Sequence, residues 1–403
     1  MSQRGGSPSP PPSEPYRALF PLGALFAFLG AGVWPLTLWA GLAYPGSLHA
    51  SLMIQGFELA FVSGFLLTVA PRMTRTDLAD RREVPWVALT LVGFGVAAWS
   101  GHQTTAQTFS LATLLLLALA LARRFFRRQN DPPEEFVFAP VGLFLGIAGT
   151  IIQLAASAGW IVEPSYRLGL RLLSLGMMLS LVLGLGALLI PVFLEMKNPL
   201  VIPKIAGPHE RPGRRALYGA LALSLALTFV ADAVRVFPLA AWGRALIATL
   251  QLGLVWKIWR LPGRRTVPAF VLWSSGWLIG LGLWGAALEP RYAVGAMHVT
   301  LLGGFGALTM GIASRVTVTH GGHGPAAEVR LLTPDRAGLL GLALVTRLLG
   351  EFDRPRAPWW FAASALAWMA AWLGWLLASR RYLSPRAAAS SATPGQQGAQ
   401  IPN

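Results

Sequence analysis

Residues 48–72 read LHASLMIQGFELAFVSGFLLTVAPR, and this stretch decides the kind of fold. Its apolar run is long enough for a helix to cross a bilayer, which takes roughly 20 residues. It also lacks the alternation that a transmembrane barrel strand requires. His49 lies near its start and Glu58 in its middle. The stretch therefore predicts a membrane-spanning helix that carries two unusual polar side chains.

The rest of the chain repeats this pattern. Of its 403 residues, 54% are hydrophobic and 12% are charged, which is typical of a polytopic membrane protein. We expect an all-α fold with about twelve transmembrane helices in one bundle. The expected spans are 18–43, 48–70, 84–101, 103–122, 137–162, 167–194, 215–234, 238–257, 268–287, 293–314, 337–350 and 358–379. The eleventh is short and the seventh adjoins the eighth closely, so ten or eleven spans stay open.

The two ends of the chain differ from its middle. Residues 1–15 are rich in Ser, Pro and Gly, and residues 383–403 are rich in Ala, Ser, Gly and Gln. We expect two disordered cytoplasmic tails around a transmembrane domain over residues 16–382. The chain has no cysteine, which excludes disulfides, thiolate zinc sites and cysteine-bound iron–sulfur clusters.

The net charge of +16 is distributed as in a membrane protein and not as in a nucleic-acid-binding protein. With twelve spans the termini share one side, and most of the 33 lysines and arginines fall there. The opposite side holds few: Arg167, Arg235, Arg291, Arg354 and Arg356. We therefore expect the lipid bilayer as a partner, no nucleic acid, and both termini in the cytoplasm.

His49 and His298 each lie about one turn inside an apolar helix, near its outward end. Small residues accompany both histidines, so another helix or a flat macrocycle can approach closely. Two neutral imidazoles at one depth could clamp a haem iron or share a copper ion. The alternative is that each histidine separately hydrogen-bonds backbone or water near the interface.

Glu58 points away from His49 around the helix, and Arg167 and Arg171 share one face of the sixth span. Glu58 is either a proton-path group or an acid hydrogen-bonded to another helix. The two arginines either extend to the interface or hold an anionic group, such as a haem propionate.

Three polar residues lie at or beyond the far end of the tenth span. Arg315 is roughly 25 Å beyond His298 along the helix, so it cannot contact the same metal. It either extends to the interface or binds a lipid phosphate or a propionate of a second group. His320 and His323 flank two glycines in the next loop. They could share a divalent metal, although such a site needs further ligands.

Three stretches resemble motifs of the NnrS family, haem- and copper-containing membrane proteins linked to nitric oxide. They are LHASLMIQGF (48–57) with GFLLTVAPRMT (64–74), GALLIPVFLE (186–195) and MHVTLLGGFGALTMGIASRVTVTHGGH (297–323). The resemblance implies that His49, His298 and Arg315 bind a cofactor, with b-type haem expected, and that His49, His298 and His320 are metal ligands. The chain departs from the family pattern at Ser51, Leu52, Leu188 and His323. Ser51 replaces a histidine, which weakens the expectation of copper.

The second and tenth spans are also similar, more distantly, to those of subunit I of haem–copper oxidases. In that subunit a low-spin haem is held by histidines on the second and tenth helices. The likeness implies a bis-histidine haem between His49 and His298. It implies no oxygen-reducing centre, because Ala296 and the sixth and seventh spans supply no further histidine.

Together these features predict an NnrS-type haem, or haem and copper, protein of the bacterial inner membrane. We expect it to act in nitric oxide response or nitrosative-stress resistance. Electron exchange with a membrane donor and direct binding of the gas both stay open, as does enzymatic turnover. The alternative is a cofactor-free secondary transporter or membrane scaffold, because twelve spans also suit transporters built from repeated halves.

Overall fold

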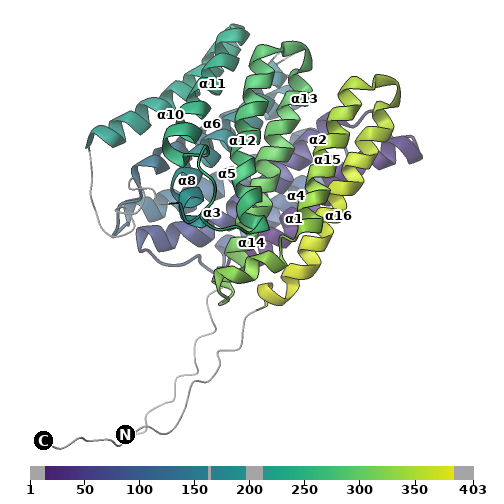
Figure 1. Cartoon of the computed structure of the whole chain (residues 1–403). Coiled ribbons are helices and arrows are strands. Elements are labelled where there is room, and N and C mark those ends of the chain that lie inside the picture. Colours follow the sequence, from purple (N-terminus) through teal and green to yellow (C-terminus); the bar gives the residue numbers. More distant parts are fainter. Residues whose placement is uncertain (1–13, 162–164, 197–211, 385–403) are drawn as a thin grey trace, which may run out of the picture.

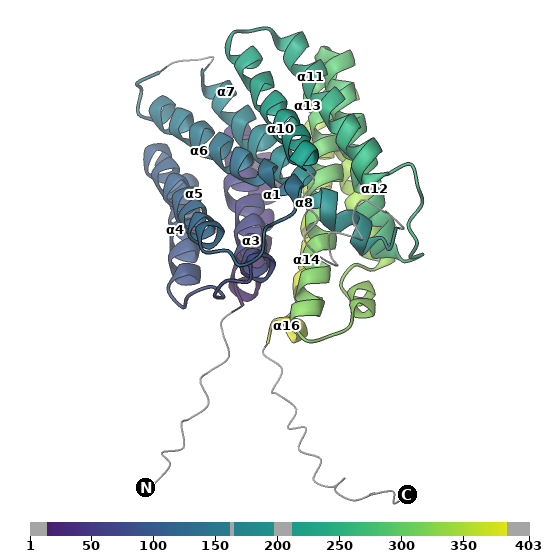
Figure 2. The same ribbon diagram turned by 90° about the vertical axis from the view of Figure 1, so that its left-hand side faces the viewer.

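The computed structural model describes residues 14–161, 165–196 and 212–384, and these ranges contain helices and no strand. The helices pack side by side in one bundle (Figures 1 and 2). The ring of Tyr16, at the start of the first helix, lies 6.2 Å from that of His320, and the His323 ring lies 4.7 Å from that of Tyr382. The beginning of the first helix and the end of the last helix therefore lie on the same side of the bundle. The expected tails lie almost wholly outside the described residues.

Each of the twelve predicted spans corresponds to a helical rod within the described ranges. The first six rods are α1 (Tyr16–Ala40), α2–η1–α3 (Gly46–Ser51, Leu52–Glu58, Leu59–Thr74), α4 (Glu83–Trp99), α5 (Gln103–Phe126), η2–α6 (Glu134–Val137, Phe138–Ser157) and α7–η3–α8 (Ser165–Arg171, Leu172–Met177, Met178–Phe193). The other six are α10 (Pro212–Ala233), α11–η4 (Phe237–Leu250, Gln251–Trp256), α12 (Val267–Leu288), η5–α13–η6–α14 (Pro290–Tyr292, Ala293–His298, Val299–Gly306, Ala307–His320), α15 (Pro334–Phe352) and η8–α16 (Arg354–Arg356, Ala357–Leu383). The short helix η7 (Pro325–Arg330) connects α14 to α15.

Ten of the rods in the described ranges are long and apolar enough to cross a membrane. The other two are α4, which has 17 residues, and α15, which has 19 residues and carries Arg347 and Glu351. Both pack within the bundle, α4 against α5 and α15 against α16. The predicted all-helical membrane fold is confirmed, and the helix count agrees approximately with the expected twelve.

An aromatic core holds the second and tenth rods against α16. Phe57 and Phe61 each place their ring centroid 5.0 Å from that of Trp372. Gly306 lies against Trp368, where an added Cβ would come within 2.5 Å of the indole ring. Only a glycine lets η6 approach α16 this closely. This packing brings the helices that bear the two membrane histidines next to each other.

Candidate functional site

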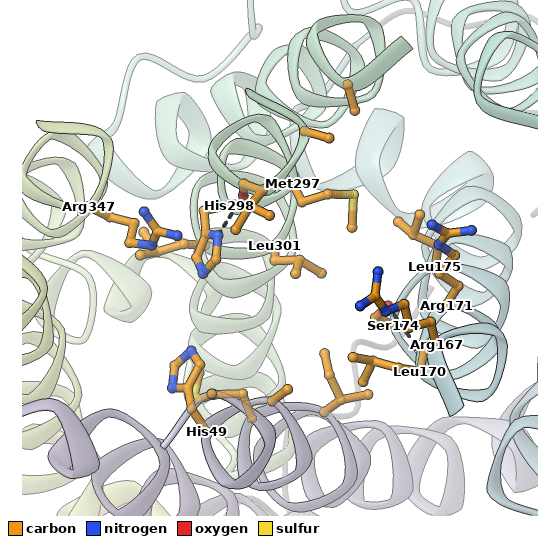
Figure 3. A pocket seen from close by; sticks show the side chains of 18 of the residues that line it. His49, Arg167, Leu170, Arg171, Ser174, Leu175, Met297, His298, Leu301 and Arg347 are labelled. Atoms are coloured by element: carbon orange, nitrogen blue, oxygen red, sulfur yellow. Dashed lines mark hydrogen bonds between the residues drawn. The ribbon is translucent and has the colours of Figure 1, made fainter. Parts of the chain in front are cut away.

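His49 and His298 face each other. Their ring centroids are 6.4 Å apart and their ring planes differ by only 11°. Figure 3 shows the two imidazoles pointing toward one another from opposite helices. A metal–imidazole bond of about 2 Å on each side, added to the radius of each ring, gives a centroid separation of about 6 Å. The spacing therefore fits one metal ion held between the rings.

A backbone carbonyl fixes the tautomer of each imidazole. Nδ1 of His49 donates to the carbonyl oxygen of Gly30 on α1, and Nδ1 of His298 donates to that of Val294 on its own helix, both at 2.8 Å. A carbonyl can only accept, so the proton is on Nδ1 and the lone pair is on Nε2. This is the arrangement of metal-ligating histidines, whose second nitrogen is held by an outer partner.

Aromatic and charged side chains support the histidine pair. The Trp34 ring lies edge-on to His49 at 5.6 Å and to Phe361 at 5.0 Å. The Arg347 guanidinium lies 4.4 Å from the Phe361 ring centroid and pairs with Glu351 at 3.4 Å. In Figure 3, Arg347 lies beside His298. These contacts restrict the imidazoles and place a balanced ion pair next to them.

The two histidines line a cavity of about 1060 Å³. This volume is at the upper end for small-molecule and cofactor sites. Its apolar lining comes from helices across the bundle: Ala31, Met53, Ile54, Phe57, Leu170, Leu175, Met297, Leu301, Leu302 and Trp368. A large, mainly apolar ligand with a central metal suits this volume, this lining and this donor set.

The opposite wall of the cavity is positively charged. Arg167 and Arg171 lie across the cavity from the histidines (Figure 3), and Arg244 also lines it. Asp232 pairs with Arg171 at 3.3 Å and with Arg244 at 2.6 Å. The cavity therefore has the two imidazoles with the Arg347–Glu351 pair at one side, and three further arginines with Asp232 at the other.

Three π-helical segments begin beside these polar residues. The segment η1 starts three residues after His49, η3 directly after Arg171, and η6 directly after His298. A π-turn shifts the side chains that follow it around the helix, and such turns are frequent at functional sites. Each segment contributes cavity-lining residues, for example Phe57, Ser174 and Leu301.

Glu58, at the end of η1, reaches the same cavity and joins two rods. Its Oε2 accepts a hydrogen bond of 3.0 Å from the hydroxyl of Thr309 on α14. The side chain is buried. The interhelical hydrogen bond expected of a membrane acid is therefore present, and the acid also lies at the cavity wall.

A family model described as "NnrS protein" matches residues 12–386, nearly the whole chain. The chain belongs to the NnrS family. No curated protein matches it. The likeness to oxidase subunit I stays a prediction.

The NnrS motif residues fall at two separate places. His49 and His298 lie at the cavity, whereas Arg315 pairs with the buried Glu328, with Nη2 at 2.9 Å from Oε1. His320 lies at the end of α14, against Tyr16. Neither Arg315 nor His320 lines the cavity. No three His, Asp or Glu side chains of the described ranges gather as a metal site. The cofactor role of Arg315 and the metal role of His320 stay predictions of the resemblance.

Several residues that line the cavity were not predicted as site residues from the sequence. Arg347 and Glu351 are spaced four apart on the weakest predicted span, and this spacing was a usable signal of an ion pair. Asp232 and Arg244 belong to consecutive spans, and only the packing of α7, α10 and α11 brings them to Arg171.

Proposed function

We propose that this protein is a membrane haem protein of the NnrS type that acts in nitric oxide response or nitrosative-stress resistance. His49 and His298 would hold a b-type haem from its two faces. The observation that carries the proposal is the facing pair of imidazoles, which line a large, mainly apolar cavity and whose Nδ1–H groups each donate to a backbone carbonyl oxygen.

The residues of the cavity fit this group. Neutral imidazoles are the usual ligands of low-spin haem, and their spacing accommodates one metal ion. When bound, a haem supplies one-electron chemistry and a gas-binding iron. Electron transfer requires no movement of His49 or His298, whereas direct binding of nitric oxide requires one of them to leave.

We further propose that the protein lies in the bacterial inner membrane with the histidine pair toward the outer side. The carboxyl-terminal ends of α14 and α16 lie with the start of α1. In the expected topology, most of the lysines and arginines fall in loops on this same side of the membrane. This is the distribution expected of a cytoplasmic side. Copper remains a hypothesis drawn from the resemblance.

The test is a reduced-minus-oxidised visible spectrum of the detergent-purified protein. We expect a b-type signal in the wild type that is lost in His49→Ala and in His298→Ala. His102→Ala is the matched control, because His102 is an exposed loop histidine. No pigment in folded protein supplied with excess haem would overturn the proposal.

That outcome would favour the alternative of a cofactor-free transporter. The large cavity and its arginine wall also suit an anionic solute. Binding of such a solute in pigment-free protein would then be the next measurement.

A further inference from the structure

A cluster of three charged side chains, two of them buried, lies on the cavity wall that faces the two histidines. Asp232 of α10 accepts hydrogen bonds from Arg171 of α7 and Arg244 of α11, one carboxylate oxygen for each guanidinium. The Asp232 side chain is 1% exposed and that of Arg244 is 7% exposed. All three residues line the cavity. The cluster therefore joins three helices directly at the ligand space.

The three side chains have an excess of positive charge. Two guanidinium groups share one carboxylate, and arginine stays protonated in proteins. Excess charge within a membrane-spanning bundle is costly unless a counter-charge accompanies it. The Arg347–Glu351 pair beside the histidines is balanced by comparison. A negatively charged group in the cavity would offset the excess on this wall.

The guanidinium groups are also held in place for recognition. Arg171 lies 5.0 Å from the Phe237 ring centroid, and Arg244 lies 5.0 Å from that of Phe229. Each guanidinium has five N–H donors in a plane, and Asp232 uses one from each. The Arg171 side chain is 39% exposed, so further donors are accessible. This planar fork matches the geometry of a carboxylate.

We propose that Arg171 and Arg244, positioned by Asp232, form a carboxylate subsite that binds the propionate groups of the haem. This inference rests on the proposed function. The cofactor is then oriented with its anionic edge toward α7, α10 and α11 and its iron toward His49 and His298. The cavity selects a macrocycle with free carboxylates over one without them.

The test compares haem with haem dimethyl ester, in which both propionates are neutral. Apo-protein from haem-depleted cells is titrated with each compound, and binding is followed by the Soret absorbance. We expect wild type to bind haem at least about tenfold more tightly than the ester, as loss of a charge-assisted hydrogen bond predicts. Arg171→Gln should lower the affinity for haem by a similar factor and leave that for the ester unchanged.

Arg354→Gln is the matched control, because Arg354 is an exposed arginine outside the cavity. Since Arg244 is nearly buried, Arg171 is the primary variant, and a thermal transition in detergent establishes that it folds. Equal affinity of wild type for haem and its ester would overturn the carboxylate subsite while leaving histidine ligation in place. Failure of folded wild type to bind either compound would overturn the proposed function, and the subsite with it.

Discussion

His49 and Gly30 are joined across two helices, because Nδ1 of the imidazole donates to the Gly30 carbonyl oxygen at 2.8 Å. A Cβ added at Gly30 would lie 2.8 Å from Met53 Sδ and 3.2 Å from Leu52 Cβ. The absence of a side chain at Gly30 therefore sets both the approach of α1 to the second rod and the orientation of one proposed haem ligand.

Gly30→Ala should lower both stability and haem retention. The added methyl forces α1 away from Leu52, and overpacking of this kind costs about 1–3 kcal/mol. Gly32→Ala is the control, because its Cβ would meet only Met369, at 3.8 Å. Thermal transitions in detergent and the ratio of Soret to protein absorbance measure both effects. Equal behaviour of the two variants would show that the contact between α1 and the second rod does not hold His49 in place.

Replacing one imidazole by a thioether should change the electron affinity of the haem without releasing it. His49→Met keeps a donor at the same helix position, and methionine–histidine ligation raises the reduction potential relative to two histidines. A redox titration followed by visible absorbance should give a higher midpoint potential than wild type. An unchanged midpoint in pigment-bearing protein would argue that His49 is not a ligand of the iron.

The features that could be predicted from the sequence were properties of single helices. Apolar run length predicted the rods, and the positions of His49 and His298 at matching depth suggested a shared site. The structure then supplied the neighbouring positions of α2 and α13 that this hypothesis needed. Two of the predicted spans are weaker than the other ten: α4 is apolar but has only 17 residues, and α15 carries Arg347 and Glu351.

The features that could not be predicted from the sequence depend on contacts between helices. The π-segment η6 places Gly303 and Gly304 against Leu278 and Ile279 of α12, and no local pattern predicts that register. Asp232 had no recognisable partner in the sequence, because Arg171 and Arg244 belong to other rods and no helical spacing links them to it. A charge within a span indicates that a partner exists, while the fold decides which one it is.

The hydrogen bond from Thr309 to Glu58 should stabilise the contact between the second and tenth rods. Thr309→Val removes the donor and keeps the shape, which leaves a buried acid without this partner. We expect a loss of about 1 kcal/mol in the free energy of unfolding, as for other interhelical hydrogen bonds in membranes. Thr309→Ser retains the hydroxyl and is the control.

A double-mutant cycle with Glu58→Gln isolates this pair. If the effects of Thr309→Val and Glu58→Gln simply add, the two side chains do not interact in the folded protein. Unfolding by denaturing detergent, followed by circular dichroism, provides the free energies.

Arg315 should contribute to stability and not to the spectrum of the bound haem. Its guanidinium pairs with the buried Glu328, which also forms an ion pair of 3.2 Å with Arg264. These three side chains connect α14, η7 and the segment before α12. Arg315→Gln leaves Glu328 with one cation, and breaking a buried ion pair costs about 3 kcal/mol. Arg330→Gln, an exposed arginine at the same end, should cost little.

The visible spectrum of the folded Arg315→Gln protein should match that of wild type, because Arg315 does not line the cavity. The NnrS resemblance alone makes the opposite prediction, since it assigns Arg315 to cofactor binding. A shifted Soret band or a lower haem content at unchanged stability would therefore favour a second cofactor site at this end of α14. A lower thermal transition with an unchanged spectrum would establish Arg315 as a residue that holds the helix ends together.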